Sequence, residues 1–315
     1  MPKYQYYLVT GGAGFIGSHL VEKLDNMGCR VRVLDDFSTG KEENLSHLSK
    51  RVEIIRGDVR DQKLCFKAAE GMEVVLHQAA LASVPRSISE PHLAHEINVT
   101  GTLNLLLAAA KTGVKSFVFA SSSAVYGDDQ TFPKKEGQEG KSLSPYAAQK
   151  LSSEKYCQVF SRLYGFNAVC LRYFNVFGPR QDPNSQYAAV IPIFITRMLQ
   201  GKPPVIFGDG HQSRDFIYVE NVVQANLQAA EFDSFRGEVF NIGTATRVTI
   251  NKLAEVLNSC LNLSLQPIYA DPRPGDIYES FADISRAEKY LGFKPEIDFV
   301  QGLKLTIDWY KNKIK

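Results

Sequence analysis

The chain has 315 residues, of which 36 are Lys or Arg and 34 are Asp or Glu, so its formal charge is +2 at pH 7. A balance this close to neutral excludes the strong basic footprint of a nucleic-acid or anionic-membrane binder. Hydrophobic residues make up 44% and charged residues 22%, a globular composition at a length that allows two domains or one large domain with an appended lobe.

The first half of the chain alternates short apolar runs with amphipathic stretches. The apolar runs predict strands at Tyr4–Thr10, Val31–Leu34, Val52–Ile55, Val74–Leu76 and Phe117–Phe119. Helical spacing between them predicts helices at Ile16–Met27, Gln62–Ala69 and Leu93–Lys111. Strands that alternate with helices predict βαβ units, and therefore an α/β fold with a Rossmann-like, doubly wound parallel sheet.

After about residue 175 the alternation loosens and prolines become frequent. Sheet or helix character returns at Asp215–Val219, Glu220–Glu231, Val239–Ile242, Thr249–Leu261, Ser285–Leu291 and Phe299–Lys311. We therefore expect a first domain over residues 1–175, to which the chain returns around 211–245, and a smaller α/β lobe formed mainly by residues 176–315.

The sequence predicts no disulfide scaffold, metal site or membrane segment. Its five cysteines are scattered, odd in number and never spaced as Cys-x-x-Cys, which is typical of a reducing cytoplasm. We interpret His92 and His95, beside Glu96, as a solvated helix start. No apolar run approaches the ~20 residues of a membrane span, and Tyr6–Val9 is too short for the core of a secretory signal.

Gly11, Gly14 and Gly17 follow the first predicted strand and open the first predicted helix. Glycines at this spacing let backbone N–H groups approach a pyrophosphate at a helix N-terminus. Asp35 ends the second strand, where a carboxylate accepts hydrogen bonds from an adenosine ribose and repels a 2′-phosphate. The pattern predicts an NAD site; Asp58, after the third strand, is either an adenine ligand or a loop acid.

Tyr146 and Lys150 stand four residues apart, so they share one face of the helix that Ser144 and Pro145 open. A nearby ammonium and a helix N-terminus both favour a phenolate. We therefore expect the pKa of Tyr146 to be lowered toward the range of a general base.

Three serines, Ser121–Ser123, end the strand that contains Phe119. Open α/β sheets bind ligands at this edge. We expect Ser122, with Ser123 as a second candidate, to hydrogen-bond a substrate hydroxyl and to pass its proton toward Tyr146.

These motifs resemble the extended short-chain dehydrogenase/reductase superfamily. The matching segments are Thr10–Gly17, Ser121–Gly127, Tyr146–Lys150 and Leu171–Gly178. Phe207–Gly210, Arg214-Asp215 and Arg273–Asp276 resemble its nucleotide-sugar branch. Over essentially the whole chain, the sequence is most similar to the UDP-N-acetylglucosamine/UDP-glucose 4-epimerases, in particular to the subgroup that prefers N-acetylated sugars.

The resemblance implies that residues 1–175 bind NAD and that the lobe over 176–315 binds a UDP-sugar. It assigns to NAD Gly11, Gly14, Phe15, Ile16, Gly17, Asp35, Asp36, Ser38, Thr39, Gly40, Asp58, Val59, Gln78, Ala79, Ala80, Asn98, Tyr146, Lys150 and Tyr173. It assigns to the substrate Ala82, Ser83, Ser122, Ser123, Tyr146, Asn175, Ala189, Val190, Val205, Ile206, Phe207, Arg214, Arg273, Asp276 and Ser280. In this scheme Arg214 and Arg273 grip the diphosphate, and Asp276 accepts from the uridine ribose.

The implied reaction is reversible epimerisation at C4 of a UDP-hexose. Ser122 is followed by Ser123 and Ala124, where related dehydratases and decarboxylases carry an acid. Ser280 stands where enzymes restricted to UDP-glucose carry a Tyr, which favours conversion of UDP-GlcNAc to UDP-GalNAc; UDP-glucose, UDP-galactose and uronic forms stay open. A dehydratase, decarboxylase or reductase is the alternative, and a non-catalytic NAD-sensing protein is a further one, although it would need no Tyr146–Lys150 pair.

The resemblance also implies a homodimer. Family members pair the helices that correspond to Leu93–Lys111 and Pro145–Tyr164 across a two-fold axis. Both stretches carry apolar residues beyond one face, among them Leu103, Leu107 and Val159.

Overall fold

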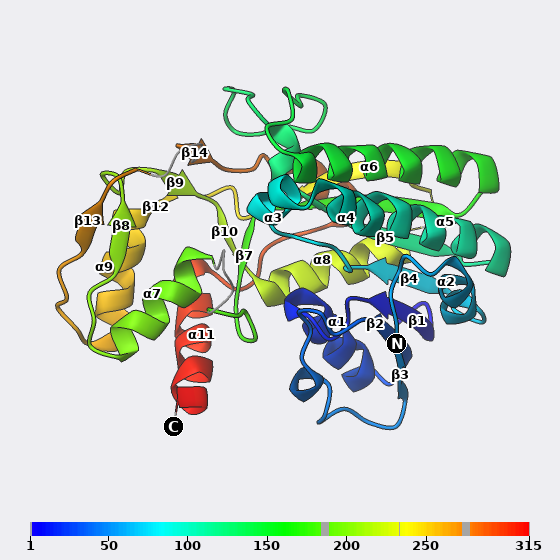
Figure 1. Ribbon diagram of the computed structural model, residues 1–315, viewed down its shortest axis with the longest axis horizontal. Helices are drawn as coiled ribbons and strands as arrows, with labels where there is room; N and C mark the ends of the chain where they lie inside the picture. The colour runs from blue at the N-terminus through cyan, green and yellow to red at the C-terminus, as the bar shows by residue number, and fades with distance from the viewer. Residues whose placement is uncertain (1, 184–188, 233, 273–277, 315) are drawn as a thin grey trace.

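The computed structural model describes residues 2–183, 189–232, 234–272 and 278–314 (Figure 1). Its centre is a seven-stranded parallel sheet with the strand order β11-β6-β5-β4-β1-β2-β3. The strands are β1 (Tyr6–Thr10), β2 (Arg30–Asp35), β3 (Val52–Arg56), β4 (Val74–His77), β5 (Ser116–Ser122), β6 (Asn167–Tyr173) and β11 (Arg236–Ile242). This order is the doubly wound Rossmann order with one added strand, so the predicted fold class is confirmed.

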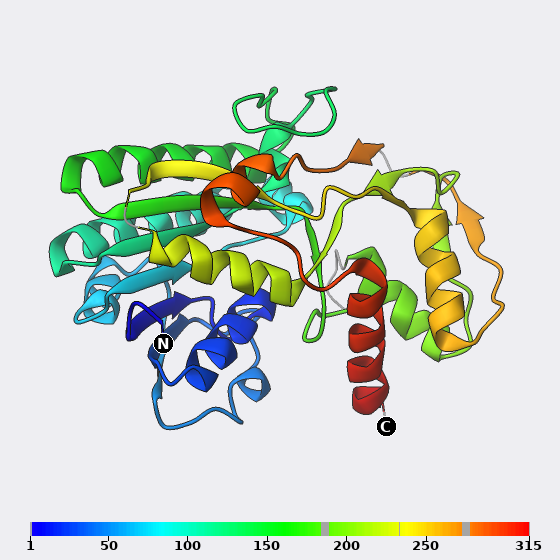
Figure 2. The same cartoon turned by 180° about the vertical axis from the view of Figure 1, so that it is seen from behind.

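Helices cover both faces of the sheet (Figures 1 and 2). One layer contains α1 (Phe15–Asn26), α8 (Val219–Glu231) and α10 (Ser285–Leu291), and the other contains α2 (Gln62–Ala69), α5 (Gly101–Thr112) and α6 (Pro145–Tyr164). Successive strand residues point to opposite faces: Leu8 belongs to the core under α2 and α5, and Val9 to the core under α1 and α8. Both are 0% exposed, as a sheet covered on both faces requires.

The start of α6 follows the expected capping chemistry. The Ser144 hydroxyl accepts a hydrogen bond from Ala147 N at 3.2 Å, Pro145 is the first helical residue, and Gly165 ends the helix with φ +77°. Tyr146 therefore lies in a first turn whose direction is fixed locally, and Lys150 lies one turn further along the helix.

The helix predicted over Leu93–Lys111 is not uniform. A short helix, α4 (Pro91–His95), passes through a π-helical turn at Glu96–Thr100 into α5. The turn presents Asn98, whose side chain bonds Leu81 N (2.8 Å), Leu81 O (3.2 Å) and Gln149 Oε1 (2.9 Å). Hydrophobic spacing cannot distinguish a π turn from the α-helix around it, and such turns often mark functional sites.

The second lobe packs α7 (Val190–Leu199), α9 (Ile250–Leu261) and α11 (Phe299–Ile314) around their own apolar core. Its short strands pair as β8 (Val205–Phe207) with β13 (Ile268–Ala270), β7 (Asn175–Phe177) with β10 (Phe216–Tyr218), and β9 (Ser213–Arg214) with β12 (Val248–Thr249) and β14 (Glu279–Ser280). The chain returns to the first lobe through α8 and β11. It also returns through α10, because Ala287 and Leu291 join the core beneath α8. The proposed domain boundaries omit this last return.

Asp215 fastens the two lobes. Its buried carboxylate accepts hydrogen bonds from Thr244 N (2.8 Å), Thr244 Oγ1 (2.7 Å), Ala245 N (3.0 Å) and Ala282 N (3.1 Å). Burial raises the pKa of this carboxyl, and the four hydrogen bonds oppose that rise. These hydrogen bonds hold the segments after β11 and β14 against Asp215, which directly follows Arg214 in the chain.

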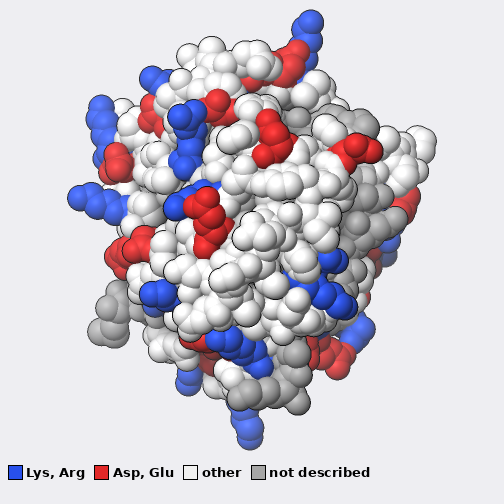
Figure 3. Space-filling view, turned by 90° about the vertical axis from the view of Figure 1, so that its left-hand side faces the viewer, with Lys and Arg blue, Asp and Glu red and all other residues white. Residues whose placement is uncertain are grey.

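The surface agrees with the balanced composition. On the face shown in Figure 3, acidic and basic side chains are interspersed over the described atoms. Among the described residues, no helix combines the length and the apolar character that crossing a membrane requires.

Candidate active site

The glycine loop joins β1 to α1 and is pressed against its neighbours. Gly11 has φ +66°, and a Cβ there would lie 2.7 Å from Ala79 N, beyond the end of β4. A Cβ on Gly17 would lie 2.0 Å from Gly11 O. Both positions therefore exclude any side chain, which keeps the turn tight.

The opposite side of this loop is open and suits an anion. Gly14 is the N-cap of α1, no side chain caps the helix, and its first turn contains no acidic residue. A Cβ on Gly14 would contact only Gly11 O, at 3.2 Å. A helix N-terminus with no side-chain cap and no acidic residue in its first turn fits the diphosphate of a dinucleotide.

Asp35 ties the loop after β2 to the glycine loop. Its carboxylate is 6% exposed and accepts hydrogen bonds from Ala13 N and Phe37 N, each at 2.8 Å. A Cβ on Gly40 would lie 2.9 Å from Asp35 Oδ1, so the loop folds back over this carboxylate. Asp36, in contrast, is exposed and accepts from Ser38 N and Oγ. The ribose role of Asp35, with contacts from Asp36, Ser38, Thr39 and Gly40, stays a prediction.

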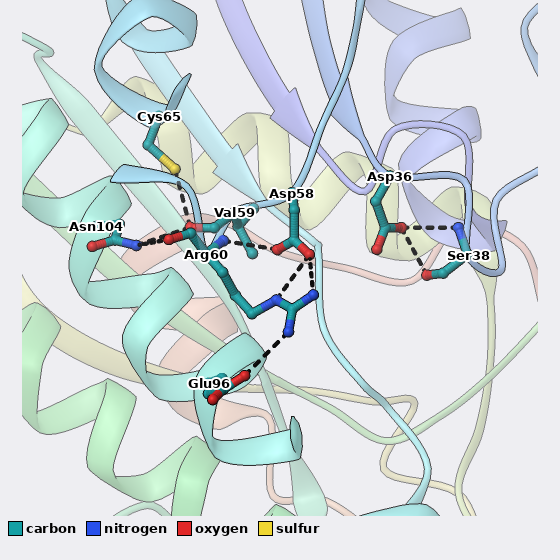
Figure 4. Close-up of polar contacts among 8 residues, drawn as sticks. All are labelled: Asp36, Ser38, Asp58, Val59, Arg60, Cys65, Glu96 and Asn104. Atoms are coloured by element: carbon teal, nitrogen blue, oxygen red, sulfur yellow. Dashed lines mark hydrogen bonds and ion pairs between the residues drawn. The ribbon is translucent and has the colours of Figure 1, made fainter. Parts of the chain in front are cut away.

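Asp58 already has a partner (Figure 4). Arg60 donates to its carboxylate from Nε at 2.8 Å and from a terminal nitrogen at 2.6 Å, and reaches Glu96 of the π turn at 3.1 Å. Burial opposes ionisation, but the hydrogen bonds from Arg60 hold the pKa of Asp58 below its ordinary value. The carbonyl of Val59 accepts from Asn104 Nδ2 at 3.0 Å, which fixes the same loop. The adenine contact assigned to Asp58 and Val59 remains a prediction.

The catalytic candidates meet at the carboxyl end of β5. Tyr146 is 8% exposed and its hydroxyl hydrogen-bonds Ser122. Lys150 is 3% exposed; its Nζ donates to Ala120 O at 2.7 Å and lies 5.8 Å from the centre of the Tyr146 ring. Ser123, the second candidate, is half-buried and begins a 3₁₀ turn. The structure therefore brings Ser122, Tyr146 and Lys150 together.

The expected direction of the Tyr146 pKa is wrong for this structure. Burial raises the pKa of Tyr146, and the hydrogen bond from Ser122 only opposes the rise. Burial also lowers the pKa of Lys150 to about 8, against the influence of Cys157 and Glu154. Helical spacing predicted the pairing, but not that both groups are taken out of water, where desolvation outweighs the attraction.

A second polar cluster lies beside the ends of β4 and β6. The Gln78 amide donates to the Tyr173 hydroxyl at 3.1 Å, and the Asn226 amide of α8 donates to the same hydroxyl at 2.8 Å. Asn226 is fully buried and was not predicted, because no sequence motif links α8 to this edge. Asn98, one of the residues assigned to NAD, donates its amide hydrogens to Leu81 O and Gln149 Oε1 and so supports the loop containing Ala79 and Ala80; its contact with NAD stays a prediction.

The predicted substrate residues fall on several elements. Arg214 of β9 is half-buried and lies in register with Ser280 of β14. Asn175, at the start of β7, donates to Asp215 O at 3.2 Å, and Ser83 caps α3 (Val84–Ser89) through Arg86 N. In the second lobe, Val205, Ile206 and Phe207 form β8, Ala189 is exposed and Val190 begins α7, whereas the exposed Ala82 lies in the first lobe between β4 and α3. Arg273 and Asp276 lie outside the described residues.

A separate hollow of about 500 Å³ lies at the opposite end of the sheet. It is lined near the amino ends of the strands by residues that include Tyr6, Arg30, Arg32 and Lys50. None of the predicted site residues lines it. Among the described residues, no group of three His, Cys, Asp or Glu side chains is placed to hold a metal ion.

A glycine-rich βα turn and a Ser–Tyr–Lys group at the carboxyl edge of a doubly wound sheet define a nucleotide-dependent short-chain dehydrogenase/reductase. The chain belongs to the NAD dependent epimerase/dehydratase family, whose model matches residues 7–243. It is therefore an NAD-dependent enzyme of the nucleotide-sugar epimerase type.

Its relatives are similar over nearly their whole lengths. A putative UDP-glucose 4-epimerase of Methanocaldococcus jannaschii is 43% identical over 97% of this chain and 98% of its own. The structure of a UDP-N-acetylglucosamine 4-epimerase from Methanobrevibacter ruminantium M1, in complex with UDP-N-acetylmuramic acid, has a TM-score of 0.94 and 44% identity, covering 99% of this chain and all of the other. A UDP-glucose 4-epimerase from Thermotoga maritima, with UDP-glucose, has a TM-score of 0.92 and 41% identity over 98% and 99% of the two chains.

The family also contains other chemistries. A UDP-N-acetyl-α-D-glucosaminuronate decarboxylase of Bacillus cytotoxicus is 33% identical over 96% of this chain and 97% of its own. Membership in the family thus leaves the choice of reaction and of sugar to the residues at the site.

Proposed function

We propose that the protein epimerises C4 of a UDP-hexose, with UDP-GlcNAc and UDP-GalNAc as its preferred pair. The observation that carries the proposal is the Ser122–Tyr146–Lys150 group at the end of β5, with no carboxylate in the 3₁₀ turn Ser123–Tyr126 that follows Ser122. Decarboxylases and dehydratases that resemble this chain carry an acid there. Without one, removal and return of hydrogen at C4 is the chemistry that the group supports.

The side chains divide the work at C4. The Tyr146 phenolate accepts the proton of the C4 hydroxyl, and Ser122 hydrogen-bonds the same oxygen as the carbonyl forms. Lys150, as an ammonium beside the phenol, favours the phenolate. NAD bound at the glycine loop would supply reversible hydride acceptance at C4, and rotation of the 4-keto sugar between the two transfers would turn its other face to the cofactor. Tyr146 then gives its proton back to the C4 oxygen, so no net oxidation occurs.

The same residues provide sites for both ligands. The glycine loop, with Asp35, would hold the dinucleotide diphosphate and ribose, and Gln78 and Tyr173 would flank the nicotinamide. Arg214 would bind the substrate diphosphate and β8 the uracil. Tight binding of NAD suits a reaction that restores its cofactor in each cycle.

Small residues at the sugar support the N-acetyl preference. Ser280 is half-buried in β14, next to Arg214 of β9, and Ala82 and Ala189 are exposed small residues. The M. ruminantium enzyme, named for UDP-N-acetylglucosamine, supports this preference, whereas the M. jannaschii and T. maritima relatives carry the name of the UDP-glucose enzyme. UDP-glucose is therefore the competing substrate.

Product analysis tests this proposal. Purified enzyme is incubated separately with UDP-GlcNAc and UDP-glucose, without added cofactor, and the products are identified by NMR. We expect conversion at C4 of both sugars, faster for UDP-GlcNAc. A 4-keto product, loss of a carbon or no reaction with either sugar would overturn the assignment, and faster conversion of UDP-glucose would reverse the preference.

We also propose that the enzyme is a homodimer. Leu105 and Leu106 bury against the sheet, but α6 leaves Val159 50%, Leu163 71% and Tyr164 53% exposed. An apolar stripe of this kind on a helix suits a two-fold partner that presents the same stripe.

A further inference from the structure

Three successive turns of α6 contact three successive residues of β5. Tyr146 hydrogen-bonds Ser122, and Lys150 donates to Ala120 O. Glu154, one turn further along the same face, accepts a hydrogen bond from Ser121 Oγ at 2.5 Å. The proposed mechanism uses the first two contacts and gives no role to the third.

Glu154 is held from a third element. Arg172 of β6 lies opposite Ser121 in register and donates to both carboxylate oxygens of Glu154, from Nε at 2.8 Å and from a terminal nitrogen at 2.7 Å. Both side chains are buried, Glu154 at 1% and Arg172 at 2% exposure. A bidentate pair of this kind has one favoured geometry, so it fixes α6, β5 and β6 relative to one another.

A buried ion pair is expensive to form, because both charges lose their hydration. Replacement by apolar side chains would often leave stability unchanged, so stability alone gives little reason for a charged pair here. The position of the pair does give a reason for the charge. Ser121 precedes the serine that hydrogen-bonds Tyr146, and Glu154 follows Lys150 by one helical turn.

We propose that Glu154 is a positioning residue of the active site. Held by Arg172, it fixes Ser121, and through it Ser122, against Tyr146, and its charge keeps Lys150 protonated. This inference rests on the proposed roles of Tyr146 and Lys150, and adds a residue to them that never touches the substrate.

Other charged and titratable groups act on the same two side chains. Cys157 and Glu154, both on the same helix, raise the pKa of Lys150, and Lys150 lowers the pKa of His77 in β4. Glu154 itself raises the pKa values of Arg172 and Cys170 in β6. Of the two acids beside Arg172, only Glu154 acts on Lys150; Glu139 lies 2.5 Å from the far terminal nitrogen of Arg172, and its side chain is 21% exposed.

Glu154→Gln and Glu139→Gln form a matched pair, because each removes one carboxylate from Arg172. Lys150 is needed as an ammonium, so the rate falls as pH rises through its pKa. We expect Glu154→Gln to lower kcat at least tenfold at unchanged KM, and to move the alkaline limb of kcat down by about 1 pH unit, the scale of one nearby charge. Glu139→Gln should leave both kcat and its alkaline limb at the wild-type values.

Ser121→Ala and Ser161→Ala test whether Glu154 acts by holding Ser121, and through it Ser122, in position. Each removes a buried serine hydrogen bond; Ser161 donates to Phe166 O at 2.6 Å, far along α6. We expect Ser121→Ala to lower kcat severalfold without moving the alkaline limb, and Ser161→Ala to affect only the thermal midpoint. These variants keep the Glu154–Arg172 pair, so they decide the proposal if Glu154→Gln fails to fold.

All rates are compared with those of the wild type, whose epimerisation is established first. A wild type that does not epimerise refutes the proposed function. With an active wild type, a folded Glu154→Gln enzyme with the wild-type kcat and alkaline limb overturns the positioning role, as does a Ser121→Ala enzyme indistinguishable from Ser161→Ala. Equal losses in Glu154→Gln and Glu139→Gln would also overturn it, since they would reflect only the loss of one carboxylate partner from the buried charge of Arg172.

Discussion

At the scale of single residues, burial and neighbouring groups have opposite effects on the pKa of the Tyr146 phenol. Burial disfavours the Tyr146 phenolate and the Ser122 hydroxyl favours it, while the Lys150 Nζ lies 5.8 Å from the centre of the ring. The tyrosine is therefore a base only in a fully assembled site. Its hydroxyl is the group on which the proposed chemistry depends.

Tyr146→Phe removes that hydroxyl and keeps the ring. We expect kcat to fall by about 10²–10⁴-fold, the usual worth of a general base, while KM changes little because the ring still packs. Steady-state kinetics with UDP-GlcNAc measure both, and Tyr164→Phe, at the exposed end of the same helix, serves as the control. A Tyr146→Phe enzyme with near-normal kcat would contradict the assignment.

Ser280→Tyr tests the sugar preference. A phenol at this half-buried position in β14 should fill the space needed by an N-acetyl group. We expect kcat/KM for UDP-GlcNAc to fall at least tenfold more than kcat/KM for UDP-glucose, since overfilling a pocket costs about 1–3 kcal/mol. Equal losses on both sugars would place Ser280 outside the sugar site.

At the scale of elements, His77 links β1 and β4 to the π turn. Thr102 donates its hydroxyl hydrogen to Asn98 O at 2.7 Å, so it can only accept from His77 Nε2, 3.0 Å away. His77 Nδ1 then accepts from Thr10 Oγ1 at 2.7 Å. The network fits a neutral imidazole with its proton on Nε2 and joins the glycine-loop strand to Asn98.

This network predicts sensitivity to acid. Burial, helped by the charge of Lys150, lowers the pKa of His77 to about 3, below its ordinary value. The unfolded chain thus binds the proton more tightly, so the stabilisation is present above about pH 6.5 and is lost as pH falls toward 3. From pH 7 to pH 5, His77 should remove about 2 kcal/mol from the free energy of unfolding.

Urea denaturation at pH 7 and pH 5 measures this loss. His77→Gln should make the difference between the two pH values smaller by about the same 2 kcal/mol, whatever its effect at pH 7. His47→Gln, at an exposed histidine, should leave the difference unchanged. An identical pH dependence in His77→Gln and the wild type would mean that His77 is not the group responsible.

At the scale of the whole molecule, α6 serves two functions on two faces. Its inner face carries Tyr146, Lys150 and Glu154, and its outer face carries the exposed Val159 and Leu163. A partner that covers the outer face would therefore stiffen the helix that holds the catalytic group.

Val159→Asp with Leu163→Asp tests the assembly. Charges on this stripe would be buried without partners in a dimer, so we expect a dimer in the wild type and a monomer in the double variant at micromolar concentration. Light scattering gives the mass. Ile268→Asp, at a comparably exposed residue of β13, should leave the dimer intact; a monomeric wild type would exclude the proposal.

The sequence by itself determined the fold and the candidates for the chemistry, because both depend on short-range spacing. Alternating apolar and amphipathic runs define βαβ units, and Tyr146 and Lys150 share a face because they are one helical turn apart. Gly11 and Gly17 were found for the same reason, since the constraint on each comes from the loop itself and from the adjoining strand end.

Only the tertiary structure decided the burial, the pKa shifts and the hydrogen-bond partners of those groups. The direction of the Tyr146 pKa depends on burial by distant segments, and the contacts of Asn98, and of Glu96 with Arg60, depend on a π turn that shares its apolar pattern with an α-helix. The contacts of Asn226 and Asp215 join elements far apart in the chain, and the Glu154–Arg172 pair joins a helix to the strand that follows it. Such contacts leave no periodic signal, because they are set by how the strands and helices pack and not by how each one forms.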